Sequence, residues 1–307
     1  MNQIRWIDSK ELFEGFGYGR AIAAITALLD SGFDPSGDHP RLHVDFSHGQ
    51  GLLMPSEIGQ RVGLKFVTVA PANPSKGRDR IQGTYTLLDS ETLTPILQCD
   101  GAALTLLRTA SMTAAVVAKL GAPKSPKVAI FGSGPQAVAH AMALRQVTSA
   151  KQISLFARNP STSREVISRL VAEGFEAEIG NSQSLAAADV VLTLTSSATP
   201  VLGSQDVQQN VIIAAVGSHA PNMRELEGEL MASGSVYVES SKSAMTEAGD
   251  VVMAMNEGKL SQSRLIEIRQ LFGGTSGVEN KGRRIYKSTG MSWQDLAIMA
   301  ALERSLS

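Results

Sequence analysis

The sequence is short of features that would indicate export, a metal centre or a charged partner. It has a single cysteine, Cys99, so no disulfide can form within the chain, and a reducing compartment is expected. A lone thiol without a CxxC neighbour is typical of a buried apolar side chain rather than a reactive one. Basic and acidic residues nearly balance, at 28 and 29, for a formal net charge of −1. We therefore expect neither nucleic acid nor an anionic membrane as a partner.

Long hydrophobic runs are also missing. No uninterrupted apolar run reaches the roughly 18 residues that indicate a membrane-spanning helix. The N-terminus MNQIRWIDSKELF carries charges throughout and lacks the apolar core of a signal peptide. We therefore expect a cytoplasmic protein. The histidines have no metal-ligand spacing, and with one cysteine no metal site is expected. The chain does have 307 residues, of which 43% are hydrophobic and 19% charged, enough for two globular domains.

The first third of the chain mixes helical and strand-like patterns. Residues 8–32 predict a capped helix that ends at Gly32. Residues 102–121 predict a second helix, rich in alanine, that ends at Gly121. The pieces between them predict strands and one hairpin, namely LHVDFS, GLLMPSEI, GLKFVTVAP and GTYTLLDSETLTPILQCDG. A short linker of turn formers, APKSPK, follows the second helix.

From Lys127 onward the pattern changes to short apolar strands that alternate with helices. Continuous β-branched runs separated by helices predict a parallel sheet covered on both faces, an α/β fold. After Gly273 the pattern predicts a loop, and SWQDLAIMAALERSL then predicts a closing amphipathic helix. The expected strands are KVAIFGSG, QISLFARN, VVLTLT, VIIAAVG and SVYVES.

The first of these strands runs into a glycine-rich turn and directly into a helix. VAIFGSGPQAVAHAMAL fits the G-x-G-x-x-G/A pattern of dinucleotide-binding sites in the strand–turn–helix context that the pattern requires. The first glycine allows the tight turn, the second lets the backbone approach a pyrophosphate, and the alanine allows close helix packing. The pyrophosphate would bind the free N–H groups at the helix N-terminus. The expected cofactor contacts here are Gly132, Ser133, Gly134, Pro135, Gln136 and Ala137.

The end of the second strand distinguishes the two nicotinamide cofactors. NAD-binding proteins place an acidic residue about 20 residues on, where it binds the ribose 2′-hydroxyl. Here LFARNPSTSRE places Arg158 and Asn159 there instead. Arg158 can pair with a 2′-phosphate, helped by Asn159, Ser161 and Thr162, so NADP(H) is the expected cofactor. The alternative is that Arg158 is a solvated charge at a strand end, which leaves NAD(H) possible.

Three basic residues lie in apolar segments before the nucleotide-binding part. Arg41 precedes a strand, Lys65 lies within GLKFVTVAP, and Arg108 lies within the apolar helix. Because lysine and arginine are rarely buried without a partner, together they predict a pocket for an anion such as a carboxylate. Each taken alone is also compatible with a structural ion pair. Desolvation could lower the pKa of Lys65 and make it a proton donor.

Seven segments of the chain coincide with the motifs of one enzyme family. They are LLMP at 52–55, LKFVTV at 64–69, LTLLRTASMTAAVVAKL at 104–120, FGSGPQAVAH at 131–140, AVGSHAPNMREL at 215–226, VYVESSKSAMTEAGDV at 236–251 and IYKSTGMSWQDLA at 285–297. In this order, over nearly the whole chain, the sequence resembles the ornithine cyclodeaminase/mu-crystallin family.

The resemblance implies a homodimer whose protomer has two domains. A Rossmann-type doubly wound parallel sheet domain, residues 121–289, would be inserted in an α+β substrate-binding and dimerisation domain, residues 1–120 plus 290–307. By matching position, Arg41, Lys65 and Arg108 would contact the substrate, and Arg80 would line a remodelled pocket. The remaining expected cofactor contacts are Thr109, Thr195, Val216, Gly217 and Ser288.

Members of the family differ in chemistry, and two departures in this chain favour a reductase. Cyclodeaminases carry an aspartate where this chain has His219, and an acidic residue where it has Arg158 or Asn159. The expected reaction is the NADPH-dependent reduction of Δ1-pyrroline-2-carboxylate or Δ1-piperideine-2-carboxylate to L-proline or L-pipecolate. Lys65 and Arg108 are the candidate catalytic residues, and His219 is a third.

Other activities stay open at the level of sequence. An ornithine cyclodeaminase would need a base for ammonia loss, and His219 is the local candidate. A related amino-acid dehydrogenase is a further alternative, since the family includes alanine dehydrogenases. A non-catalytic, crystallin-like protein that only binds the nucleotide is the third, although three cations in apolar segments argue against it.

Overall fold

The chain folds into two compact units. The computed structural model describes residues 4–274 and 281–306. The first unit comprises Met1–Leu28, Gly37–Met112 and Gly290–Ser307, and the second comprises Leu29–Ser36 and Thr113–Thr289. The second unit is therefore inserted in the sequence of the first. The structure has the expected α/β class, with a Rossmann-type sheet in the inserted unit. That the first unit binds substrate and forms a dimer stays a prediction.

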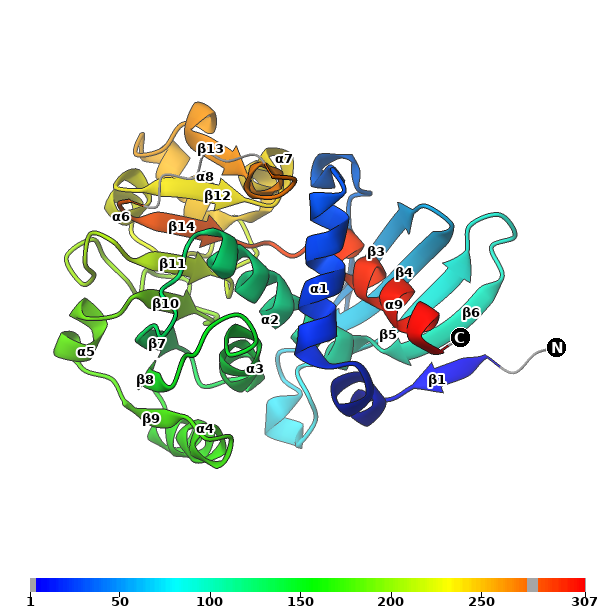
Figure 1. Ribbon diagram of the computed structural model, residues 1–307, viewed down its shortest axis with the longest axis horizontal. Helices are drawn as coiled ribbons and strands as arrows, with labels where there is room; N and C mark the ends of the chain where they lie inside the picture. The colour runs from blue at the N-terminus through cyan, green and yellow to red at the C-terminus, as the bar shows by residue number, and fades with distance from the viewer. Residues whose placement is uncertain (1–3, 275–280, 307) are drawn as a thin grey trace. The chain divides into compact units, whose positions relative to one another are not determined.

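The first unit is built on a six-stranded sheet in the order β1-β6-β5-β4-β3-β2. Neighbouring strands are antiparallel except β1 and β6, which are parallel. The helix α9 (Ser292–Leu306) lies against β3, β4 and β5 (Figure 1). A π-helical turn, Glu11–Phe16, leads into α1 (Gly17–Asp30). The strands are β1 (Arg5–Ile7), β2 (Leu42–Phe46), β3 (Gly49–Ile58), β4 (Arg61–Val69), β5 (Ile81–Asp89) and β6 (Pro95–Asp100).

The two faces of this sheet differ. Successive side chains of a strand point to opposite faces, and on β3 and β4 every second residue is buried. Met54, Lys65 and Val67 are on the buried face, where α9 packs. The opposite face carries apolar side chains that stay exposed, among them Leu42 and Phe46 on β2. The sheet thus buries Lys65 in the core of the first unit.

The second unit is built on an eight-stranded sheet in the order β13-β12-β14-β11-β10-β7-β8-β9. All its strand pairs are parallel. The chain order reverses between β7 and β10, the switch point at which doubly wound sheets bind ligands. The strands are β7 (Val128–Phe131), β8 (Gln152–Phe156), β9 (Glu176–Ile179), β10 (Val190–Thr193), β11 (Ile212–Ala215), β12 (Ser235–Val238), β13 (Leu265–Glu267) and β14 (Arg284–Lys287).

Helices connect these parallel strands. The strands β7, β10, β11 and β14 are buried along their whole length, as expected for a sheet covered on both faces. The connecting helices are α3 (Pro135–Leu144), α4 (Pro160–Ala172), α5 (Ser182–Ala186), α6 (Gly228–Ala232), α7 (Ser241–Glu247) and α8 (Gly249–Asn256). Helix α2 (Gly101–Lys119) precedes β7, and its residues up to Met112 belong to the first unit.

Two helical stretches are long and apolar enough to cross a membrane if only length and composition are considered. They are Glu11–Asp30 and Gly101–Lys119. Neither contains an uninterrupted apolar run of about 18 residues. Within the fold, 78% of the Gly101–Lys119 stretch is buried, against 28% of Glu11–Asp30. The first of these values is what a core helix of a globular unit shows.

The prediction of a loop after Gly273 is wrong for one stretch. Arg284–Lys287 forms β14, a buried strand between β11 and β12. Its sequence RIYK has a cation at each end, so it lacks the apolar pattern of the other strands. Both cations have partners in the fold. Arg284 donates to the carbonyls of Leu120 and Asn210, and Lys287 pairs with Asp250. The segment 275–280 lies outside the described residues.

Candidate functional site

The glycine-rich turn after β7 has the backbone that a dinucleotide site needs. Gly132 follows β7 with φ +114°, a conformation that side chains other than glycine rarely adopt. Its N–H donates to the carbonyl of Phe156 at 2.8 Å, which ties the turn to the end of β8. A Cβ at Gly132 would lie 2.7 Å from the carbonyl oxygen of Leu194. Only glycine therefore fits at this position.

The start of α3 is open to a ligand. Gly134 is the N-cap of α3, and a Cβ added to it would meet no atom within 4 Å. Ala137 is fully buried, as close helix–strand packing requires. The side-chain oxygen Oε1 of Gln136 is buried and has no hydrogen-bond partner among the described residues. An exposed helix N-terminus beside an unpaired polar atom fits the pyrophosphate of a dinucleotide.

The end of β8 carries the residues expected to select the cofactor. Arg158 is exposed, and its side chain forms no ion pair with any described residue. Asn159 is the N-cap of α4, and its side chain accepts the backbone N–H of Ser161 at 2.9 Å. Ser133 Oγ lies 2.6 Å from Thr162 Oγ1, which joins the glycine-rich turn to α4. Arg158 is thus available to an anion, whereas Asn159 also shapes the helix that follows.

The other expected cofactor contacts are spread over both units. Thr195 follows β10 and Val216 and Gly217 follow β11, so they lie at the carboxyl ends of two neighbouring strands. Ser288 follows β14, and its buried hydroxyl donates to Glu239 Oε1 at 2.9 Å. Thr109 belongs to the first unit, and its hydroxyl donates to the carbonyl of Thr105 at 2.7 Å.

His219 lies in the loop after β11, and its side chain is exposed. In the same loop, the carbonyl of the buried Ser218 accepts Lys287 Nζ at 2.6 Å. The catalytic role considered for His219 stays a prediction.

The first unit brings three of the predicted residues into one cluster around a carboxylate. Lys65 Nζ lies 2.6 Å from Asp295 Oδ2, and both side chains are fully buried. Arg108 Nε lies 3.7 Å from Asp295 Oδ1, and Arg108 also donates to Gln294 Oε1 at 3.1 Å. Arg41 donates to the carbonyl of Gly290. Strand β4, helix α2 and helix α9 therefore each supply one charged residue to the cluster.

The charges of this cluster are incompletely compensated. Burial lowers the pKa of Lys65 to about 8, the positive charges of Arg108 and Arg41 lower it as well, and the Asp295 carboxylate opposes the shift. Arg108 Nε and Asp295 Oδ1 are both buried without a hydrogen-bond partner in the described part of the chain. Among the described residues, Lys65 and Arg108 both pair with the one carboxylate of Asp295, so the cluster can accept a further anion.

Asp295 is the functional candidate that sequence reasoning missed. It lies in the first turn of α9, in SWQDLAIMAALERSL, where most neighbours are apolar and buried. A charged aspartate within such a helix is the same kind of signal as the charged Lys65 and Arg108 in their apolar segments.

Arg80, which was expected to line the substrate pocket, is exposed on the loop before β5 and makes no ion pair with a described residue. The structure does not bring Arg80 into the cluster.

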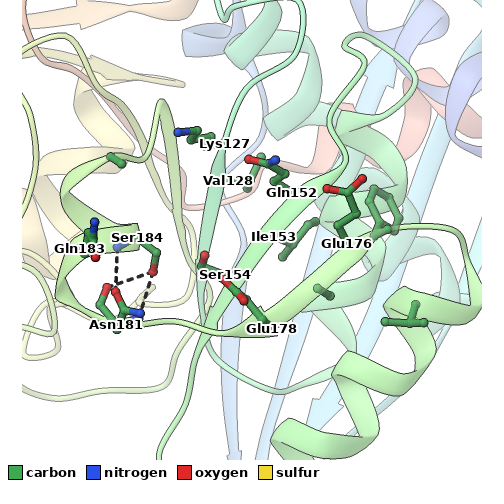
Figure 2. Close-up of a pocket in the computed structure, with 14 residues that line it drawn as sticks. Lys127, Val128, Gln152, Ile153, Ser154, Glu176, Glu178, Asn181, Gln183 and Ser184 are labelled. Atoms are coloured by element: carbon green, nitrogen blue, oxygen red, sulfur yellow. Dashed lines mark hydrogen bonds between the residues drawn. The ribbon is translucent and has the colours of Figure 1, made fainter.

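A separate hollow of about 730 Å³ lies elsewhere on the second unit (Figure 2). Its lining includes Lys127 and Val128 at the start of β7, Gln152 at the start of β8, and Glu176 and Glu178 on β9. It is thus at the opposite end of β7 from the glycine-rich turn, and none of the predicted site residues lines it. Across residues 4–274 and 281–306, no group of three or more potential ligands could hold a metal ion.

Comparisons with known proteins show which proteins this chain resembles. The model of the ornithine cyclodeaminase/mu-crystallin family matches residues 23–306. A Δ1-pyrroline-2-carboxylate reductase of Bacillus cereus is 30% identical over 269 residues, 84% of this chain and 82% of that protein. The ketimine reductase mu-crystallin of Mus musculus is 26% identical over 76% of this chain and 72% of that protein. A solved Δ1-pyrroline-2-carboxylate reductase from Thermococcus litoralis, in complex with NADH and L-proline, superposes with a TM-score of 0.90 at 22% identity, covering 98% of this chain and 97% of that one.

Proposed function

Because the chain belongs to the ornithine cyclodeaminase/mu-crystallin family, we propose that it is an oxidoreductase that reduces the C=N bond of a cyclic imino acid. The substrate would be Δ1-pyrroline-2-carboxylate or Δ1-piperideine-2-carboxylate, and the product L-proline or L-pipecolate. The observation that carries the proposal is the buried cluster of Lys65, Arg108 and Asp295 in a chain that also has a complete dinucleotide-binding turn. The 30% identity to a reductase of this substrate supports it.

The residues of the first unit would bind and activate the substrate. Arg108 and Arg41 would pair with its carboxylate, since guanidinium groups bind carboxylates with two parallel hydrogen bonds. Lys65 would supply or maintain the proton on the imine nitrogen, which makes the neighbouring carbon accept hydride more easily. Asp295 would hold the ammonium group of Lys65 in place. When bound, the nicotinamide cofactor supplies the hydride.

The activity itself is tested by following NADPH oxidation with each of the two cyclic imines. We expect consumption of NADPH that depends on the imine, with formation of proline or pipecolate. Ammonia release from ornithine with NAD is measured in parallel. Ammonia release without imine reduction would contradict the proposal in favour of a cyclodeaminase. Tight NADPH binding without turnover of either substrate would favour a non-catalytic nucleotide-binding protein.

The exposed Arg158 supports a preference for NADPH. Its guanidinium has no carboxylate partner among the described residues, and it follows β8, where the adenosine ribose binds in doubly wound sheets. The 2′-phosphate of NADPH would provide that partner. The relative from Thermococcus litoralis was solved with NADH, so the proposed preference rests on Arg158 of this chain and not on that relative.

Replacing Arg158 with glutamate should invert the preference, because a carboxylate repels a 2′-phosphate and binds a 2′-hydroxyl. We expect kcat/KM for NADPH to fall by about 10–100-fold, the equivalent of a lost charged hydrogen bond, while the value for NADH holds or rises. Arg169→Glu, in the last turn of the helix α4 that follows Arg158, is the matched control. If the ratio of kcat/KM for NADPH to kcat/KM for NADH were the same in Arg158→Glu and wild type, Arg158 would be excluded as the residue that selects the cofactor.

The pH dependence of imine reduction should reflect the protonation state of Lys65. Its pKa of about 8 means that Lys65 is protonated below pH 8, so kcat/KM should fall as the pH rises through about 8. Lys65→Arg keeps its positive charge at any accessible pH, so the decrease of kcat/KM near pH 8 should disappear. The variant should also be slower than wild type at every pH. Asp295→Asn removes the carboxylate that raises the pKa of Lys65, so the decrease of kcat/KM should move below pH 8. If kcat/KM of Lys65→Arg still fell near pH 8, the decrease would reflect titration of the substrate imine. That result would contradict the assignment of this pKa to Lys65.

The apolar outer face of the first unit's sheet supports assembly as a homodimer. Leu42 and Phe46 on β2 are 57% and 54% exposed, and Trp6 on β1 is 49% exposed. The strand pairing places Val44 and Leu64 on the same face. Exposed apolar side chains that share one face of a sheet mark interaction sites. We propose a second copy of this chain as the partner, because the same patch on two copies can pair about a two-fold axis.

Light scattering should give a molar mass near twice the 32.5 kDa of the chain. Phe46→Glu places a charge in the proposed interface and should shift the protein toward the monomer at micromolar concentration. Val171→Glu, at a residue 53% exposed on α4 of the second unit, should leave the dimer intact. A monomeric wild type, or equal dissociation of both variants, would exclude this face as the interface.

A further inference from the structure

Glu225 is a buried carboxylate that the proposed chemistry does not use. Its side chain is fully buried, and it forms no salt bridge with a described residue. It accepts four hydrogen bonds instead, which come from two separate loops. Thr195 donates its backbone N–H at 2.7 Å and its hydroxyl at 2.8 Å, and the N–H groups of Gly217 and Ser218 donate at 2.8 and 3.2 Å.

The two loops that share this carboxylate follow neighbouring strands. Thr195 lies two residues beyond β10, and Gly217 lies two residues beyond β11, which pairs with β10. The loops also touch directly: a Cβ on Gly217 would lie 2.0 Å from the carbonyl oxygen of Thr195. One carboxylate therefore fixes the spacing of two loops at the carboxyl edge of the sheet.

A second layer of buried charge holds Glu225 itself. The backbone N–H groups of Glu225 and Leu226 donate to Asp250 Oδ1 at 2.7 and 2.8 Å. Asp250 Oδ2 pairs with Lys287 Nζ at 3.0 Å, and the same Nζ donates to the carbonyl of Ser218 at 2.6 Å. The carboxylate, the ion pair and the loop after β11 thus form one closed network. Because burial makes an unpaired charge costly, no member can move without loss of several bonds.

The position of these loops gives the network a function. In a doubly wound sheet the dinucleotide extends over the carboxyl ends of the strands, across the point where the strand order reverses. Here that point lies between β7 and β10. The turn after β7 and Arg158 after β8 would hold the pyrophosphate and the adenosine half. The loops after β10 and β11 are then left for the nicotinamide half.

We propose that Glu225 is a positioning residue that fixes these two loops for the nicotinamide half of the cofactor, with Asp250 and Lys287 holding Glu225 in place. This role rests on the proposed use of a nicotinamide dinucleotide. Glu225 acts through the backbone of Thr195, Gly217 and Ser218.

Glu225→Gln tests the role, because the amide keeps the shape but presents an NH₂ group to N–H donors. The probes are NADPH and adenosine 2′,5′-bisphosphate, which lacks the nicotinamide half, each titrated calorimetrically. We expect the Kd for NADPH to rise about 10–100-fold, as for loss of one or two hydrogen bonds to a charged group, and the Kd for the bisphosphate to stay within about twofold. In steady-state assays KM for NADPH should rise more than KM for the imine.

Two further variants keep the test sharp. Glu225→Asp restores the carboxylate on a shorter side chain and should recover part of the NADPH affinity. Asp189→Asn is the matched control: Asp189 accepts a backbone N–H from Lys127 at 2.9 Å, but it precedes β10 at the amino edge of the sheet. Its Kd values should equal those of wild type.

Two outcomes would overturn the role of Glu225 alone: an unchanged NADPH affinity in Glu225→Gln, or an equal loss of NADPH and bisphosphate. A wild-type protein that binds neither NADPH nor NADH would overturn the proposed function, and with it this role.

Discussion

The ion pair between Lys65 and Asp295 is the constraint on which the first unit depends. It joins β4 to α9 across 230 positions of sequence, and both side chains are fully buried. Neither charge can be left alone in that environment, because removal of one partner of a buried pair typically costs about 3–5 kcal/mol. The final helix must therefore return to the sheet formed near the N-terminus. The same pair keeps a cation inside the unit, where Arg108 and Arg41 add to its field.

In the second unit, hydrogen bonds from backbone N–H groups help to compensate buried carboxylates. Glu225 and Glu239 are buried acids that each accept at least four hydrogen bonds, and in both cases a backbone N–H group is among the donors. Both lie beyond the carboxyl ends of strands. Buried carboxylates at this edge order loops that would otherwise have few contacts, since loops lack the ladder of bonds that holds a strand. Rigid loops at a ligand-binding edge lower the entropy cost of binding.

Local patterns were sufficient to predict the parts of the molecule whose causes are local. The strand, turn and helix around Gly132 follow one another within a few residues, so the sequence displays the whole motif. Lys65 and Arg108 stood out because a charge in an apolar segment needs a partner. The partner, Asp295, could not be paired with them from sequence, because proximity across 230 positions is a property of the fold. Strand β14 was missed because its charged ends, Arg284 and Lys287, are satisfied by distant carbonyls and by Asp250.

The order of residues along the chain also sets an order of events during synthesis. The sheet of the second unit is complete in sequence at Lys287, whereas Lys65 has no counter-ion until Asp295 has been made. Domains fold as units while the chain emerges from the ribosome, at about 5–20 residues per second. The sheet of the inserted unit can therefore assemble first. The flanking sheet must therefore hold a lysine without its counter-ion until Asp295 has been made.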